Sequence, residues 1–156
     1  MADEGLKQAK ETAEALSQYN FKHAFVSPFT RTVQTANQIL QKHPNLTMRL
    51  ENGVSEYVAN DESHPPLIEG LLSEFTNIDA TYKSKMPLPV FESKKGLFDR
   101  AKQIMKHISE TYTTTEDTSL SNHKKGLGDV LIVTHAAPAI AMVQSIRERP
   151  CLSFLD

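Results

Sequence analysis

The chain has 156 residues, 39% of them hydrophobic, with 17 Lys and Arg against 19 Asp and Glu and a formal net charge of −2. This length predicts one domain with a buried core, and the balanced charge argues against a nucleic-acid partner. The polar N-terminus and the absence of an apolar run near ~18 residues favour neither a signal peptide nor a membrane span, so we expect a cytoplasmic protein. Cys151 is the only cysteine, which excludes a disulfide framework within one chain, and we predict neither a metal site nor a cofactor.

The first third of the chain alternates helical and extended patterns. Residues 3–17 place their apolar side chains on one face, which predicts an amphipathic helix. Residues 23–27 (HAFVS) predict a short strand, and the next helix begins at residue 30 or 31 and stops before Pro44. Residues 46–50 predict a second strand, followed by the turn-prone pair Asn52-Gly53.

The middle of the chain is weaker in pattern. Residues 67–75 predict a short helix and residues 77–91 an ordered loop that contains prolines. Ser93 is a candidate cap for a helix whose buried stripe runs from Leu97 to Ile108. Residues 113–128 are polar, which predicts a mobile surface loop.

Residues 129–146 (DVLIVTHAAPAIAMVQSI) show the strongest local pattern. The four apolar residues 130–133 include three that are β-branched, which is typical of a strand buried on both faces of a sheet. Thr134 and His135 follow, and Pro138 suits the first turn of a helix. Three strands that alternate with helices predict an α/β fold with a mainly parallel sheet.

Two strand ends carry residues suited to an anion site. Arg31 follows one strand and His135 another, and ligands of α/β sheets bind where strands end and helices begin. An arginine near a helix N-terminus opposes the helix dipole, so it binds either an anion or a neighbouring carboxylate. His135 is a candidate base, nucleophile or phosphate ligand, although a histidine can also merely end a buried strand. Glu51 and Glu56 are candidates for a general acid, the alternative being solvated loop charges.

Several segments resemble a known family. SPFTRTVQTA (27–36), VLIVTHAAPA (130–139) and GLKQAKETAEAL (5–16) resemble segments of the histidine phosphatase, or phosphoglycerate mutase-like, superfamily. MRLENGVSEY (48–57) and NIDATYKSKMPLP (77–89) are similar to its phosphotyrosine-phosphatase branch, the suppressors of T-cell receptor signalling, also called the ubiquitin-associated and SH3-domain-containing proteins.

This resemblance implies a three-layer α/β/α fold and a phosphorylated ligand. In these enzymes a histidine attacks phosphorus and water then hydrolyses the phosphohistidine. By resemblance, Arg31 grips the phosphate, His135 stabilises the transferring phosphoryl group and Glu56 is the proton donor, with Glu51 as the fallback. A cation, a histidine and a carboxylate together suit phosphoryl transfer, where positioning and charge neutralisation supply most of the catalysis.

One family motif is absent. The family begins with a strand that ends in Arg-His-Gly and supplies the nucleophile, and no Arg-His pair occurs in this sequence. We therefore expect residues 1–156 to form a single domain that is incomplete at both ends and truncated at the first strand. We predict little or no hydrolysis by this chain alone. The alternatives are a pseudo-phosphatase that acts as an interaction or oligomerisation module, and a fragment or isoform of an active phosphomonoester hydrolase.

The absent strand also carries a structural expectation. The resemblance places it between the strands that lead to Arg31 and His135. Either these strands close the gap, about 4.8 Å per strand, or another molecule fills it, or the fold is destabilised. An exposed sheet edge of this kind also invites homo-oligomers.

Overall fold

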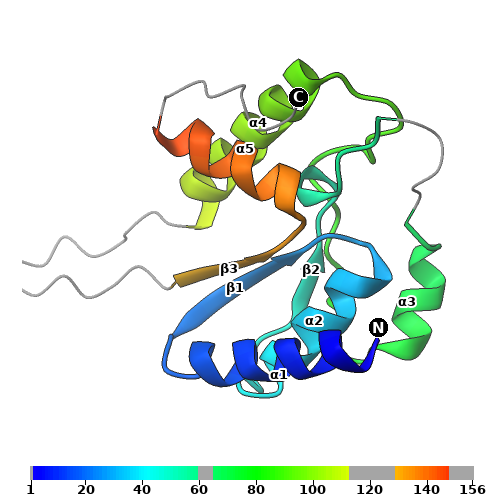
Figure 1. Ribbon diagram of the computed structural model, residues 1–156, viewed down its shortest axis with the longest axis vertical. Coiled ribbons are helices and arrows are strands. Elements are labelled where there is room, and N and C mark those ends of the chain that lie inside the picture. The colour runs from blue at the N-terminus through cyan, green and yellow to red at the C-terminus, as the bar shows by residue number, and fades with distance from the viewer. Residues whose placement is uncertain (1, 60–64, 113–128, 148–156) are drawn as a thin grey trace, which may run out of the picture.

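A computed structural model describes residues 2–59, 65–112 and 129–147 of the chain. Within them lies a three-stranded parallel sheet with the order β2-β1-β3. The strands are β1 (Phe21–Val26), β2 (Met48–Leu50) and β3 (Asp129–Val133). The helices are α1 (Asp3–Leu16), α2 (Thr30–Leu40), the 3₁₀ turn η1 (Asn52–Val54), α3 (Ile68–Glu74), α4 (Lys94–Tyr112) and α5 (Ala136–Arg147). Helices α1 and α2 lie on one side of the sheet and α4 and α5 on the other (Figure 1), so the predicted α/β fold is confirmed.

The sheet separates two apolar cores. In β1, Ala24 and Val26 pack in the core shared with α1 and α2, whereas Phe25 packs in the core shared with α4 and α5. Strand β3 alternates in the same way, since Leu131 belongs to the first core and Ile132 packs against the second. Successive side chains of a strand point to opposite faces, so a continuous apolar run is what a strand covered on both faces requires. This confirms the prediction for residues 130–133.

The strands that lead to Arg31 and His135 lie directly side by side. Their pairing runs from Phe21 opposite Asp129 to Val26 opposite Val133, with one irregularity near the start of β1. The Ser27 N–H extends the pairing by donating to the Val133 carbonyl at 3.0 Å. Their backbone groups are thus paired with each other, which leaves no room for a strand between them. Of the three outcomes left open by the sequence, the first therefore holds within the described residues: the two strands close the gap.

Helix boundaries follow local signals. Ser93 caps α4, because its Oγ accepts from the Gly96 N–H at 3.1 Å. Pro138 lies in the first turn of α5, as predicted, although the helix already begins at Ala136. The turn predicted at Asn52-Gly53 is the 3₁₀ turn η1. The predicted mobile loop at 113–128 lies outside the described residues. None of the described helices combines the length and apolar character needed to cross a membrane.

Candidate functional site

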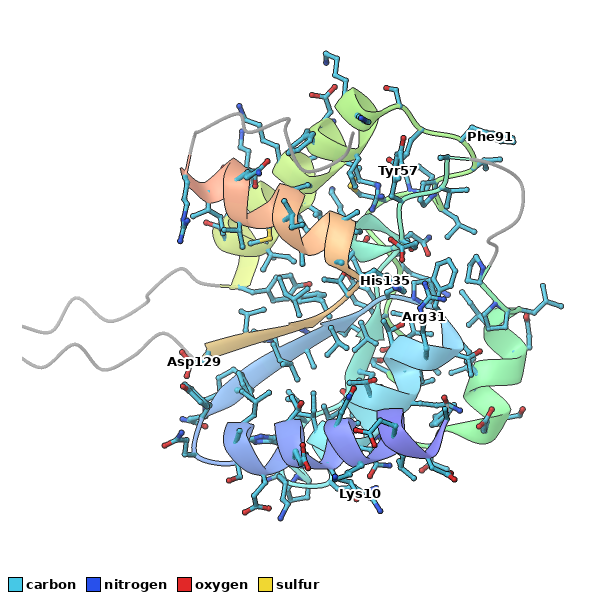
Figure 2. The ribbon with its side chains drawn as sticks, viewed as in Figure 1. Lys10, Arg31, Tyr57, Phe91, Asp129 and His135 are labelled. Atoms are coloured by element: carbon cyan, nitrogen blue, oxygen red, sulfur yellow. The ribbon has the colours of Figure 1, made fainter. Side chains whose placement is uncertain are left out.

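The candidate site lies where β1 and β3 end and α2 and α5 begin. Arg31 stands in the first turn of α2, and His135 directly precedes α5 and accepts its first bond, from the Ala139 N–H at 3.0 Å. Figure 2 shows the two side chains close together, at the end of β3 opposite Asp129. The first N–H groups of a helix lack intrahelical partners, and its dipole favours a negative charge there. Two helix N-termini and an arginine therefore converge on one edge of the sheet.

His135 is held at both ring nitrogens. Its Nδ1 lies 3.2 Å from Nε and 2.9 Å from Nη2 of Arg31, and its Nε2 lies 2.8 Å from Oγ of Ser27. A guanidinium only donates, so Nδ1 accepts and carries no proton. The ring proton then lies on Nε2 and is donated to the Ser27 hydroxyl.

The surroundings of His135 favour this neutral ring. The residue is 8% exposed. Burial lowers its pKa to about 4, with Arg31 and Arg100 adding to the effect and Glu56 opposing it. At neutral pH the imidazole is therefore an uncharged acceptor toward Arg31.

Of the two candidate carboxylates, only Glu56 is at this edge. Its Oε2 lies 3.1 Å from Nη2 of Arg31 and 3.3 Å from Nδ1 of His135. Glu51 is fully buried, and its carboxylate instead accepts bonds from η1 and from the loop at 82–86. The structure thus brings Arg31, His135 and Glu56 together and leaves Glu51 outside the group.

A cavity of about 520 Å³ opens beside these side chains. It is lined by residues of α1, α2, the loop at Glu56, the junction between β3 and α5, and the start of α5, namely Gly5, Gln8, Ala9, Thr12, Arg31, Thr32, Thr35, Glu56, Thr134, His135 and Ala136. The side chain of Arg31 is 54% exposed although it contacts His135 and Glu56. It also stacks 4.9 Å over the ring of Phe29, which restricts its direction. The guanidinium of Arg31 can therefore bind an anion in this cavity while the Phe29 ring restricts its direction.

Two hydroxyls at the site were not among the predicted site residues. Ser27 bonds the His135 ring, and the Thr134 Oγ1 donates to the Val54 carbonyl at 2.6 Å. Each directly follows a strand at the edge where Arg31 and His135 were expected, so position relative to the strand ends was the available signal. Among the described residues, no group of three His, Cys, Asp or Glu side chains is placed to hold a metal ion.

Comparison with known proteins identifies the family of the chain. The profile of the histidine phosphatase superfamily (branch 1) matches residues 1–155. The chain belongs to this superfamily. The ubiquitin-associated and SH3 domain-containing protein B of Mus musculus and that of Homo sapiens are each 29% identical to it over 177 residues, which cover 96% of this chain and 26% of theirs. The chain thus spans about a quarter of the length of these curated relatives.

Solved structures share the phosphoglycerate mutase-like fold of the superfamily. The ecdysone phosphate phosphatase of Bombyx mori, in complex with tungstate, has a TM-score of 0.72 at 22% identity and is matched over 97% of this chain and 58% of its own. A mycobacterial glucosyl-3-phosphoglycerate phosphatase has a TM-score of 0.63 at 16% identity, over 96% of this chain and 68% of its own. At these identities the likeness supports the fold alone.

Proposed function

We propose that this chain binds the phosphate group of a phosphorylated ligand of the phosphotyrosine type in the cavity beside Arg31, His135 and Glu56. The observation that carries this proposal is the half-exposed Arg31 guanidinium at the convergence of two helix N-termini. Its donors are directed at Glu56 and His135. A phosphate would compete with Glu56 for the same donors, since both are oxyanions.

Within this proposal each side chain has a distinct role. Arg31 binds phosphate oxygens, and His135 stabilises the phosphoryl group. Glu56, 3.3 Å from His135, stands where a carboxyl could protonate a leaving oxygen. Of the described histidines, only His135 lines the cavity, and the sequence holds no Arg-His-Gly. We therefore infer that this chain binds phosphorylated ligands but hydrolyses them slowly or not at all. We expect it to act in the cytoplasm.

Thermal or urea unfolding with tungstate or vanadate tests the proposal. The wild type should be stabilised by about 2.7 kcal/mol when the anion is present at about 100 times its Kd. Arg31→Ala should lose this stabilisation. Lys10→Ala removes an equal charge from the exposed outer side of α1 (Figure 2) and should retain it. No stabilisation of the wild type at millimolar anion would contradict phosphate binding.

The lateral side of β3 that faces away from β1 is not the end of the sheet that carries the candidate site, and it supports a second function, that of an oligomerisation module. Among the described strands β3 pairs only with β1, so its other side is an edge with backbone groups available for pairing. Light scattering during size-exclusion chromatography should then show a dimer or larger species at micromolar concentration. A monomer throughout would contradict this reading.

A third reading is that the sequence is part of an active phosphomonoester hydrolase, which its span of the curated relatives allows. If this chain hydrolyses an aryl phosphate and His135→Ala abolishes the hydrolysis, this reading is favoured and the prediction of little or no hydrolysis is wrong. Absence of turnover in both proteins would favour the binding role.

A further inference from the structure

Arg100 is the only Lys or Arg that is buried in the described part of the chain. It lies on α4, is 6% exposed, and forms an ion pair with the equally buried side chain of Glu92. Its remaining donors all go to backbone carbonyls: Nη1 donates to Gly53 and to Ser55 at 3.0 Å each, and Nη2 donates to Glu56 at 3.3 Å. The ion pair with Glu92 balances the charge of Arg100, and its other N–H groups fix the positions of the three carbonyls.

These carbonyls belong to one short segment. The remaining carbonyl between them, that of Val54, accepts from Thr134, the residue before His135, at 2.6 Å. Four consecutive carbonyls are thus held by two side chains, one from α4 and one from the end of β3. Buried carbonyls need partners, and η1 ends at Val54, so these bonds replace the helical bonds that would otherwise hold the segment.

The segment ends at the carboxylate of the site. The Oε1 of Glu56 accepts from the Tyr57 N–H at 2.9 Å, which leaves Oε2 toward Arg31 and His135. The direction of the Glu56 side chain is therefore set by its backbone, and its backbone is set by Arg100 and Thr134. Arg100 bonds the carbonyl of Glu56, and Thr134 bonds that of Val54, so both act on the backbone of the segment.

We propose that Arg100, together with Thr134, is a positioning residue that holds Glu56 against Arg31 and His135. The inference rests on the proposed function, in which Glu56 competes with the bound anion for Arg31. It predicts an effect that a purely structural arginine would not have. Loosening the segment should weaken the fold and yet strengthen anion binding, because the competing carboxylate is no longer held in place.

A double-mutant cycle between Arg100 and Glu56 tests this, read as tungstate affinity near neutral pH. Glu56→Gln removes the carboxylate that pairs with Arg31 and should tighten tungstate binding about tenfold. Arg100→Lys keeps the charge but cannot bridge the three carbonyls and Glu92, and it should tighten binding by part of that factor. The double variant should bind no more tightly than Glu56→Gln. The control Lys95→Arg, at an exposed pair with Asp99 on the same helix, should bind as the wild type does.

Independent effects in the cycle, or unchanged affinity in Arg100→Lys, would overturn the inference. If Arg100→Lys does not fold, Thr134→Val takes its place, because it removes a single carbonyl bond and keeps the shape of the side chain. The ¹⁵N chemical shift of His135 Nδ1 provides a reading that needs no ligand. Arg100→Lys should move this shift in the same direction as Glu56→Gln does. The double variant should have the same shift as Glu56→Gln alone. If the chemical shifts show the coupling but tungstate does not bind, the proposed function alone is refuted. If the chemical shifts show no coupling, the positioning role is refuted.

Discussion

Replacing Glu51 by glutamine should cost far more stability than the same change at Glu56. The Glu51 carboxylate is fully buried, and every contact described for it is with a donor. Its Oε1 accepts from Gly53 N at 2.7 Å, Ser84 Oγ at 2.9 Å and Met86 N at 3.3 Å, and its Oε2 accepts from Tyr82 OH at 2.6 Å and Lys85 N at 2.8 Å. This carboxylate therefore fastens η1 to the loop at 82–86.

An amide at this position meets a conflict that no rotation resolves. Hydroxyls such as those of Tyr82 and Ser84 can turn to accept from an NH₂ group, but backbone N–H groups cannot. Whichever oxygen of Glu51 becomes NH₂, at least one backbone N–H then faces another donor: that of Lys85 at Oε2, or those of Gly53 and Met86 at Oε1. A hydrogen bond to a charged group contributes about 1.5–3 kcal/mol, so Glu51→Gln should cost at least about 1.5–3 kcal/mol even in its better orientation. That is a large share of the total of about 5–15 kcal/mol typical of a domain.

Urea unfolding of the two glutamine variants measures the difference. Glu56 is partly exposed and its pair with Arg31 lies at the surface, so Glu56→Gln should change the free energy of unfolding by less than about 1 kcal/mol. A Glu51→Gln protein that is unfolded without denaturant agrees with the expectation. Equal costs for the two variants, or a cost below about 1 kcal/mol at Glu51, would refute the reasoning.

Two further predictions concern pH and packing. Burial lowers the pKa of His135 to about 4 in the folded chain, so below about pH 6.5 the unfolded state binds a proton that the folded state does not. The free energy of unfolding should therefore fall by about 2 kcal/mol between about pH 7.5 and pH 5. His135→Asn keeps an acceptor for Arg31 and should flatten this slope in urea unfolding at each pH, and an unchanged slope would assign it to other groups. A Cβ at Gly53 would lie 2.8 Å from Cγ1 of Ile104, so Gly53→Ala should cost about 1–3 kcal/mol in thermal unfolding. Gly70→Ala, in exposed α3 with nothing within 4 Å of the added Cβ, should instead stabilise by up to about 1 kcal/mol, and similar changes in both variants would contradict the packing argument.

The positions of Arg31 and His135 could be predicted because local signals fix them. A run of apolar, β-branched residues gives a strand covered on both faces, and the polar residues after it must lie at the strand's end. A strand's end in a parallel sheet is also where the next helix begins, so two such junctions share one edge. The sequence therefore located the edge of the sheet that carries the site.

Only the tertiary structure shows which of Glu51 and Glu56 lies beside Arg31 and His135. Both follow the same strand and both are glutamates in a loop, so no periodicity distinguishes them. The difference lies in the partners, since Glu51 meets donors from a loop more than thirty residues away and Glu56 meets Arg31 and His135. The direct pairing of β1 with β3 and the contacts of Arg100 were likewise set by packing. Sequence patterns record the spacing of neighbours along the chain, whereas hydrogen-bond partners far apart in sequence meet only when the cores on both faces of the sheet have formed.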